Sequence, residues 1–453
     1  MFRNALLTQF IIMAVLTLLL IIPLSMIQGV VMERSNYQTY AVHNISNSWT
    51  GSQTVVTPLL VIPYSRAYSE SVWDKRKREY IDLKKQETGQ HVFMAKTLSL
   101  TADIKTELRH RGIYSVPVYS GQFQVVGQFD PTELDEIKKD INGFSAWGEP
   151  RLILSVKDLR GIGADPALNV QGERVAFKPG TTLTSLGSGI HATSANIDLS
   201  RDIDFDLNFT LRGSQRLSFA PLAHNASIDV NSDWPHPNFT GRFLPTQREI
   251  SEKGFSASWS VSSFSTGASD IVEACAANQC EQMHSLMLGV DLFETVDIYT
   301  RTDRATKYGI LFVLLTFVAF FLTETLTKRR LHPIHYLLVG GALAMFFLLL
   351  ISFAEHLGFS AAYGIATAAC SLLVGIYLKA VLGDQRLAAI YAFAIAALYA
   401  MLFMILRSED YALLMGSLLL FMVLALVMLS TRHTDWRKIS EAMRTSRQPS
   451  ESA

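Results

Sequence analysis

Apolar residues along this chain follow two different patterns. Two blocks, roughly 5–31 and 308–430, are almost continuously apolar, whereas the residues between them mix apolar and polar side chains. A helix that crosses a bilayer needs about 20 mostly apolar residues. The two blocks therefore predict six membrane spans, at approximately 5–31, 308–326, 334–353, 360–380, 387–406 and 411–430.

Between the two blocks the apolar residues recur with a period of two. Every second residue from Ile203 to Leu211 is apolar and every intervening residue is polar. Such alternation is typical of antiparallel strands with one buried face and one wet face. It recurs over 98–108, 123–129, 255–261 and 286–292, with less regular runs near 54–62, 113–119, 151–157, 173–178 and 226–231. These runs favour a sandwich or barrel-like β domain.

Two further segments of the middle region carry local signals. Asp130-Pro131-Thr132-Glu133 combines a capping residue, a proline and a capping glutamate, and it predicts a helix that continues from Leu134. The stretch Ser262–His284 is rich in small and polar residues, so we predict a loop insertion there.

The combined pattern predicts a multi-pass α-helical membrane protein of about six spans. A large, mainly antiparallel β domain is inserted between the first and the second span. The expected domains are a cytoplasmic tip with a transmembrane anchor, a periplasmic β-rich domain, a five-helix bundle and a cytoplasmic tail, at 1–31, 32–307, 308–430 and 431–453. The first apolar run is longer than the 7–15 residues of a secretory signal and no convincing cleavage site follows it, so we interpret it as an uncleaved anchor.

The distribution of basic residues predicts the orientation. With alternating spans, Arg3, Lys328–Arg330, Lys379, Arg386 and five basic residues of the tail fall on one side, whereas the opposite short loops carry one arginine. Short cytoplasmic loops are enriched in Lys and Arg. We therefore predict a bacterial inner membrane protein with both termini in the cytoplasm and the β domain in the periplasm. Forty basic and forty acidic residues give no net charge, and nothing indicates a nucleic-acid partner.

Cysteine chemistry is limited to one candidate pair. Three cysteines are too few for a disulfide scaffold or a four-ligand zinc site. Cys275 and Cys280 lie in the predicted loop of an oxidising compartment, where a disulfide is plausible. The alternative is two free thiols, and the spacing is not that of a C-x-x-C redox motif. Cys370 lies inside an apolar run and is interpreted as a small buried residue.

Two short segments are candidate binding loops. Trp234 and His236 lie among prolines, which is compatible with a rigid binding loop, although a turn with a packed Trp is favoured. Asp158 and Arg160 lie in a glycine-containing stretch that lacks the strand-loop-helix context of a phosphate loop, so a turn with an ion pair is favoured. The basic run Lys75–Arg78 is compatible with contact to anionic headgroups, but a solvated loop is favoured.

Ionisable residues are sparse in the predicted spans. Glu324, His332 and His335 form a candidate polar cluster near the membrane interface, because they lie at similar depth and could pair. A metal pair of the two histidines is disfavoured by the intervening Pro333. The absence of midplane charges argues against an ion-coupled transporter. No sequence motif of a nucleotide-binding, hydrolase or metalloprotease site was found, so we expect no cofactor, no metal and no catalytic residue.

Several segments resemble the CreD (also called Cet) family of inner membrane proteins. The segments that carry this resemblance are Asp158–Ile162, Ser232–Phe239, Phe243–Pro245 with Arg248-Glu249, Thr302–Ile310, Phe320–Leu326, Arg330–Pro333 and Tyr336–Gly340. The likeness runs from about Met32 to the last span, but the loop with Cys275 and Cys280 has no match. The resemblance implies a role in cell-envelope homeostasis within the regulon of a carbon-source-responsive two-component system. It assigns no activity, substrate or catalytic residue.

These observations leave three functional hypotheses. The leading one is a non-enzymatic envelope protein whose periplasmic domain binds another envelope component, with the lipid bilayer and envelope proteins as partners. The alternative is a transporter or membrane enzyme acting on lipid-linked envelope material, which a polar cavity at membrane depth lined by Glu324 and His335 would favour. A sensor is a third possibility, although no cytoplasmic output domain is visible. The sequence does not determine the oligomeric state.

Overall fold

The computed structural model describes residues 5–74, 79–163, 166–277, 279–292, 298–327, 332–408 and 412–432. Arg3, the predicted basic loops Lys75–Arg78 and Lys328–Arg330, and the tail beyond residue 432 lie outside the described residues. The chain divides into two compact units, which we describe separately. The helical unit comprises residues 1–39 and 296–453, and the β unit comprises residues 40–295.

The helical unit contains the long apolar helices. Their bounds are α1 (Ala5–Ser48, which continues into the β unit), α6 (Gly309–Thr327), α7 (Pro333–Leu357), α8 (Phe359–Leu382), α9 (Gln385–Arg407) and α10 (Ala412–Thr431), and a short helix α5 (Ile298–Lys307) precedes α6. Within the described residues, five stretches are long and apolar enough to cross a membrane: Ile11–Ser48, Ile298–Glu324, α7, α8 and α9. Leu414–Leu429 in α10 is a shorter apolar segment. These helices confirm the predicted multi-pass class.

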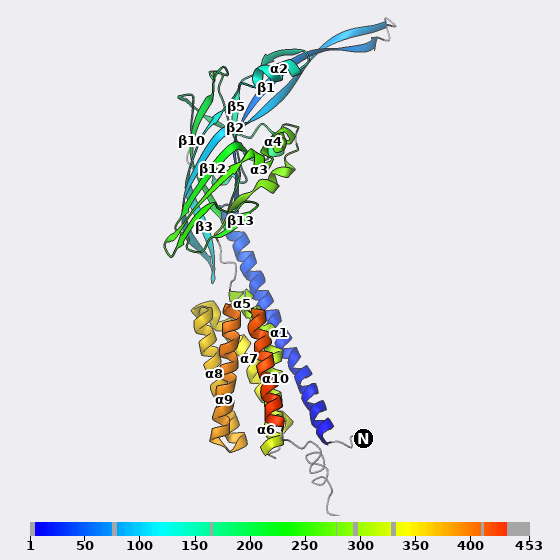
Figure 1. Cartoon of the computed structure of the whole chain (residues 1–453), viewed down its shortest axis with the longest axis vertical. Helices are drawn as coiled ribbons and strands as arrows, with labels where there is room; N and C mark the ends of the chain where they lie inside the picture. Colours follow the sequence, from blue (N-terminus) through cyan, green and yellow to red (C-terminus); the bar gives the residue numbers. More distant parts are fainter. Residues whose placement is uncertain are drawn as a thin grey trace, which may run out of the picture. The chain divides into compact units, whose positions relative to one another are not determined.

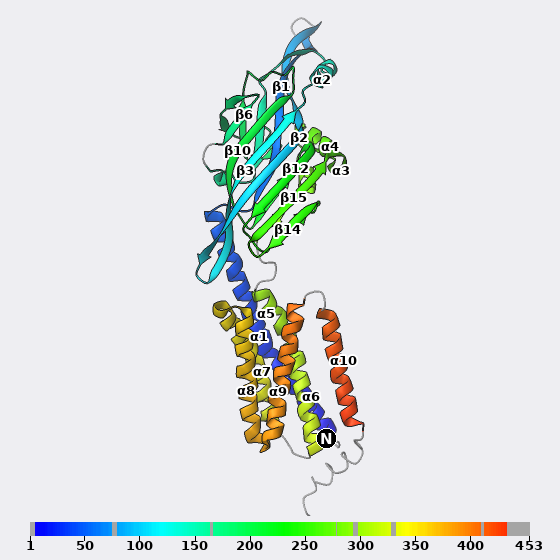
Figure 2. The ribbon, with the colours of Figure 1, turned by 60° about the vertical axis from the view of Figure 1, so that its left-hand side comes forward.

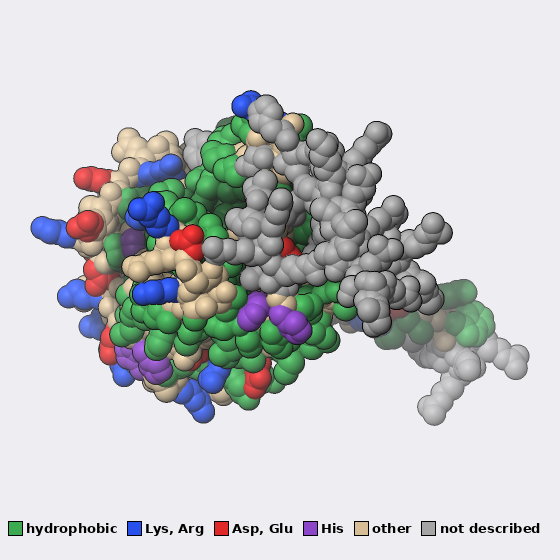
Figure 3. Space-filling view, turned by 90° about the horizontal axis from the view of Figure 1, so that it is seen from below, with side chains coloured by type: hydrophobic (Ala, Val, Ile, Leu, Met, Phe, Trp, Pro, Cys, Tyr) green, Lys and Arg blue, Asp and Glu red, His purple; other side chains and the backbone are tan. Residues whose placement is uncertain are grey.

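Aromatic side chains fill the centre of the helical unit. Phe312, Phe346 and Tyr399 are buried there and their rings stack. The outward faces carry exposed apolar residues such as Leu372 and Phe393. Hydrophobic side chains are also abundant among the coloured residues in the view from below in Figure 3. Helices that are apolar all round are typical of proteins that pack inside and contact lipid outside.

The β unit contains many strands, most of them antiparallel. Their bounds are β1 (Gln53–Asp74), β2 (Glu79–Arg111), β3 (Tyr114–Phe129), β4 (Phe144–Trp147), β5 (Arg151–Val156), β6 (Ala167–Val170), β7 (Glu173–Val175), β8 (Phe177–Pro179), β9 (Gly189–Thr193), β10 (Ile203–Ser214), β11 (Arg216–Ala220), β12 (Ala223–Ser232), β13 (Asn238–Gly241), β14 (Gln247–Ser251), β15 (Gly254–Ser262) and β16 (Leu288–Asp291). Only the pairs β1–β11 and β2–β12 are parallel among the described strands. The predicted alternating runs are thus confirmed as strands.

The strands form two sheets joined through the long strand β2 (Figures 1 and 2). One sheet contains β1, β5 and β11, and the other contains β3, β10, β12 and β15. Apolar residues from both sheets, including Leu60, Phe123 and Trp259, share one buried cluster. This common core explains the alternation, because each strand turns every second side chain toward it.

A second apolar layer corrects the predicted loop at Ser262–His284. This stretch forms α3 (Ser263–Thr266), α4 (Ala268–Ala276) and the start of η3 (Glu281–Leu286). Buried Ile271 and Val272 of α4 pack in one cluster with Val56 and Leu59 of β1. The physical reason is that β1 is apolar on both faces, so its second face also needs a cover.

The remaining short helices are η1 (Leu159–Gly161), η2 (Thr184–Leu186) and α2 (Leu134–Asp140). Helix α2 confirms the predicted helix, but its start differs from the prediction. Glu133 occupies the capping position without a side-chain hydrogen bond. The Asp130 carboxylate instead accepts bonds from the amide and hydroxyl of Thr132, which forms a turn before the helix.

Candidate functional site

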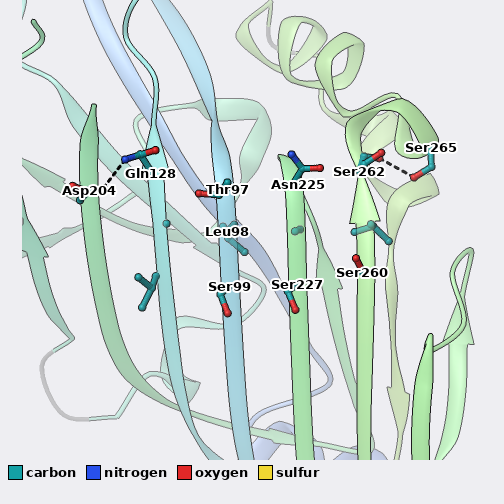
Figure 4. A pocket seen from close by; sticks show the side chains of 14 residues that line it. Thr97, Leu98, Ser99, Gln128, Asp204, Asn225, Ser227, Ser260, Ser262 and Ser265 are labelled. Carbon is teal, nitrogen blue, oxygen red and sulfur yellow. Dashed lines mark hydrogen bonds between the residues drawn. The ribbon is translucent and has the colours of Figure 1, made fainter. Parts of the chain in front are cut away.

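A shallow groove of about 670 Å³ lies on the wet face of the sheet formed by β10, β3, β2, β12 and β15 (Figure 4). The strand register places Asp204, Gln128, Thr97, Asn225 and Ser262 in one row across the five strands. These residues are far apart in the sequence. The row exists because directly opposed residues on paired strands point to the same face of a sheet.

A second row of small hydroxyl side chains lies next to the first. It contains Ser99, Ser227 and Ser260 on β2, β12 and β15, which are aligned by the same register. All three are exposed, whereas their sequence neighbours Leu98, Ala226 and Val261 are buried. We call these two rows, together with Ser265, the polar groove. It offers closely spaced hydroxyl and amide groups as hydrogen-bond donors and acceptors.

The polar groove carries little charge. Its carboxylate, Asp204, accepts a hydrogen bond from the Gln128 amide at 2.9 Å. Just beyond the first row, Lys96 bonds Asp130 at 3.0 Å. The hydrogen bonds from Thr132 and Lys96 lower the pKa of Asp130 to about 2. The arrangement therefore suits an uncharged polar ligand better than a strongly charged one.

Asp158 and Arg160 form a turn with an ion pair, as the sequence favours. The Arg160 guanidinium bonds both oxygens of the Asp158 carboxylate, with a shortest distance of 2.6 Å, and these bonds lower the pKa of Asp158. Arg160 also donates to the Asn47 carbonyl oxygen at the end of α1. Asp158 in turn exchanges hydrogen bonds with the Gln53 side chain. These hydrogen bonds fix the local conformation of the chain. Asp158 and Arg160 therefore have a structural role.

Trp234 also satisfies its polar group locally. Its indole nitrogen donates to the carbonyl oxygen of His236 at 3.0 Å, and its ring packs against the main core of the β unit. Among the described residues, no hydrogen bond or ion pair joins Trp234 or His236 to the pair Asp158 and Arg160. The structure therefore does not assemble these four predicted residues into one site.

The sulfur atoms of Cys275 and Cys280 are joined in a disulfide. Both cysteines are buried in the second apolar layer, and the Ser185 hydroxyl lies 3.1 Å from the Cys280 sulfur. The pair links the end of α4 to the segment before η3. Its position is structural, because it is enclosed by the same residues that cover β1.

The three residues of the predicted membrane-interface cluster, Glu324, His332 and His335, each form a hydrogen bond with a different partner. The Tyr336 hydroxyl donates to the Glu324 carboxylate at 3.2 Å. His335 bonds the Tyr377 hydroxyl at 2.6 Å. His332 caps the start of α7, because its ring accepts from the Ile334 amide. Glu324 also lines a pocket of only about 50 Å³ whose other walls are mainly apolar.

A second open pocket in the β unit contains residues that the sequence analysis missed. It has a volume of about 430 Å³, and Trp49, Lys105 and Arg212 are among its lining residues. The Arg109 and Arg212 guanidinium carbons lie 4.9 and 5.4 Å from the centre of the Trp49 ring. Cation–π pairs of this kind hold the ring in place. No sequence signal could have grouped these residues, because they come from distant segments.

Comparison with known proteins gives matches over nearly the whole chain. The profile of the family described as "Inner membrane protein CreD" matches residues 5–437. The curated Escherichia coli (strain K12) protein of that name is 36% identical over 427 residues, covering 93% of this chain and 92% of the relative.

The similarity to a solved structure is much lower. Native yeast LTA4 hydrolase matches with 8% sequence identity and a TM-score of 0.21, covering 49% of this chain and 35% of that chain. A score this low carries no argument about fold or function.

Proposed function

This chain belongs to the CreD family of inner membrane proteins, and from that premise we propose that its β unit binds an envelope partner in the polar groove. The β unit lies in the periplasm and the helical unit holds it at the membrane. The protein has no enzymatic activity of its own and contributes to envelope homeostasis, in a regulon controlled by a two-component system.

The distribution of basic residues supports the proposed orientation. Lys379 and Arg386 flank the short loop between α8 and α9. Glu355 and His356 lie at the end of α7, which the proposed topology assigns to the other side of the membrane. Lys and Arg are enriched in short cytoplasmic loops. The orientation places the polar groove in the compartment where envelope components are exposed.

The observation that carries the proposal is the composition of the polar groove. A sheet face that only contacts water does not need a groove. Such exposed faces often carry Lys and Glu side chains. Here about 670 Å³ is lined by eight Ser, Thr, Asn and Gln residues, by Asp204 and by apolar residues that include the exposed Val126. We infer that the partner presents uncharged hydrogen-bonding groups, because several such bonds made together can compete with water.

Topology is tested by cysteine labelling in intact cells. With Cys370 buried and the other two cysteines bonded, Ser200→Cys is expected to react with a membrane-impermeant maleimide once the outer membrane is permeabilised. Arg386→Cys is the matched control and is expected to react only after lysis. Labelling in the reverse order would contradict the proposed orientation.

Partner binding is tested with a photo-crosslinking amino acid at Ser227 in the polar groove. We expect a discrete adduct in intact envelopes, and we expect it to disappear when Ser99→Trp fills the groove. A photo-crosslinker at the exposed Ser200, outside the groove, is the control. Equal adducts from Ser227 and Ser200, or adducts that persist in the Ser99→Trp background, would overturn the assignment.

The alternative of a transporter or lipid-linked enzyme gains no support from the described residues. A polar cavity lined by Glu324 and His335 would favour this alternative. The pocket that Glu324 lines is about 50 Å³, and His335 bonds Tyr377 instead. A pocket of that volume is far smaller than the roughly 300–1,000 Å³ of typical ligand sites.

A further inference from the structure

The second pocket of the β unit, of about 430 Å³, is surrounded by basic side chains. Lys105 and Arg212 line it, and Arg109 contacts Trp49, which also lines it. Among the described residues that line this pocket, Glu107 is the only carboxylate, and it accepts a hydrogen bond from Arg109 at 3.1 Å. Three cations therefore face one carboxylate, which leaves an excess of positive charge. We call this site the basic pocket.

The strand register places two of these cations on either side of a serine. Lys105 of β2 opposes Ser120 of β3, and Ser120 opposes Arg212 of β10; Figure 2 shows the three strands side by side. All three residues are exposed. Opposed residues point to the same face, and neighbouring strands lie about 4.8 Å apart, so Lys105 and Arg212 start roughly 10 Å apart. A small anion above Ser120 is within reach of both long side chains.

Both of these cations lack an acceptor in the part of the chain that the structure describes. No ion pair or side-chain hydrogen bond joins Lys105 or Arg212 to another described residue. The carboxylates on the same face of β2 have other partners, because Glu107 bonds Arg109 and Asp103 accepts a hydrogen bond from an amide of β12. A guanidinium carries five N–H donors and an ammonium group three. These donors are therefore available to an external anion.

Trp49 orients the Arg212 side chain. The guanidinium carbon of Arg212 lies 5.4 Å from the centre of the Trp49 ring, and that of Arg109 lies 4.9 Å from it. Arg109 is itself held by its bond to Glu107. A cation–π contact of this kind restricts the guanidinium without using its N–H groups as hydrogen-bond donors to another side chain. Such ordering before a ligand arrives lowers the entropic cost of binding.

We infer that the basic pocket binds the phosphate group of a phosphate monoester. Such a group carries a charge of about −1.5 to −2 at pH 7 and has three acceptor oxygens, which matches two cations without acceptors. The Arg212 fork can bind two oxygens, and Lys105 supplies a point charge. A carboxylate or a phosphodiester carries only one charge and matches less well. The inference does not depend on the polar groove, which is lined by different residues.

The test is isothermal titration calorimetry of the full chain in dodecyl maltoside, a detergent without phosphate. The probes are methyl phosphate, a monoester, and dimethyl phosphate, a diester, at about pH 7.5, where the monoester is close to doubly charged. We expect methyl phosphate to bind about tenfold more tightly than dimethyl phosphate, because it carries more charge. Its affinity should fall as salt is added, since salt screens exposed charges.

The two cations are tested separately. Arg212→Gln and Lys105→Gln are each expected to lower the affinity for methyl phosphate about tenfold, because each removes a charge-assisted hydrogen bond. Both side chains are exposed, so the melting temperature should stay near that of the native chain. The matched control is Arg174→Gln, which removes one positive charge from an exposed position of β7 outside the pocket. Ser99→Trp fills the polar groove and should also leave methyl phosphate binding unchanged.

Three outcomes would overturn the inference. The absence of saturable binding of methyl phosphate to the native chain would exclude the site. Equal affinities for methyl phosphate and dimethyl phosphate would contradict the match to a doubly charged group. Equal losses from Arg174→Gln and Arg212→Gln would show general attraction to the charge of the β unit instead of binding in the basic pocket.

Discussion

The polar groove of the β unit and the interior of the helical unit both contain hydrogen-bonding side chains, but they use these groups differently. Ser99, Ser227 and Ser260 of the groove expose their hydroxyls on the wet face of a sheet. Inside the bundle, the Tyr363 hydroxyl donates to the Tyr399 carbonyl oxygen at 2.8 Å, and the Tyr399 hydroxyl donates to the Leu343 carbonyl oxygen. The first set of groups can bind a ligand, whereas the second set joins helices.

The difference follows from the surroundings of each region. A polar group without a partner is costly in hydrocarbon, and the two tyrosine hydroxyls of the bundle bond backbone carbonyl oxygens of other helices. Water molecules form hydrogen bonds with the polar side chains of the groove until a ligand replaces these water molecules. Under the proposed function, recognition is assigned to the β unit, whereas the described part of the bundle contributes packing. Four changes test this comparison, in order of decreasing expected effect.

The largest effect is expected from Trp259→Ala in the core of the β unit. Trp259 is only 1% exposed, and its indole nitrogen donates to the Phe243 carbonyl oxygen. Losing the ring and leaving a cavity is expected to lower the free energy of unfolding by about 3–5 kcal/mol. Urea titration followed by proteolysis of the detergent-solubilised chain measures this loss.

The control is Trp73→Ala, which removes an exposed indole and is expected to change stability by about 0.5 kcal/mol or less. Equal losses for the two variants would show that the buried cluster is not what stabilises the β unit.

A smaller effect is expected from Gly340→Leu on α7. A Cβ at Gly340 would lie 2.2 Å from Leu20 of α1 and 3.2 Å from the Phe317 ring of α6. Membrane helices associate through close packing at small residues. The side chain should therefore separate these helices and destabilise the bundle by about 1–3 kcal/mol, measured by thermal loss of the helical circular dichroism signal.

The neighbouring Gly341 supplies the matched control, because a Cβ there meets nothing within 4 Å. Gly341→Leu makes the same chemical change in the same helix and should leave the melting temperature nearly unchanged. If Gly341→Leu destabilised the bundle as much as Gly340→Leu, close helix approach would not be the cause.

A still smaller effect concerns the ion pair beside the polar groove. The pKa of Asp130 is lowered from 3.8 to about 2 in the folded chain. Its contribution to stability is therefore present above about pH 4 and is lost as the pH falls from 4 to 2. Because the carboxylate is partly exposed, we expect about 1 kcal/mol.

The Asp130→Asn variant removes the titrating group and should lose this pH dependence between pH 4 and pH 2. Unfolding curves of the two chains in urea at several pH values give the comparison. Parallel acid profiles for native chain and variant would refute the role of Asp130.

The smallest effect is expected from Tyr363→Phe in the bundle. The hydroxyl makes a buried hydrogen bond, but such bonds between membrane helices contribute only about 0.6 kcal/mol on average. The expected change is thus a shift of a few degrees or less in the melting temperature. A loss larger than that of Gly340→Leu would reverse our view that packing, not hydrogen bonding, dominates the bundle.

The helices α6 to α10 were predicted within a few residues because long apolar runs have one stable solution in lipid. The first span was predicted too short, since α1 continues from the predicted end at residue 31 to Ser48. Helix α8 (Phe359–Leu382) overlaps the predicted span 360–380 almost completely. Helix α4 was missed for a different reason. Its apolar residues Ala268, Ile271, Val272 and Cys275 follow helical spacing, but the small polar residues around them obscured this signal.

None of the candidate residues chosen from the sequence lines the polar groove. Asp158, Arg160, Trp234 and His236 attracted attention because they are rare combinations of charged, aromatic and proline residues. The groove instead uses serines, threonines and amides that occupy ordinary wet positions of alternating strands. Composition cannot mark such a site, because each residue is unexceptional until the strands are paired.

The sequence by itself determined which parts of the chain enter lipid and which face of each strand is buried, since both depend on local apolar content. Only the tertiary structure decided which residues become neighbours across strands: that Gln128 and Thr97 lie beside Asn225, or that α4 covers β1. Burial is a property of single residues and their spacing. A binding surface depends on strand register and layer order, which arise when distant segments pack together.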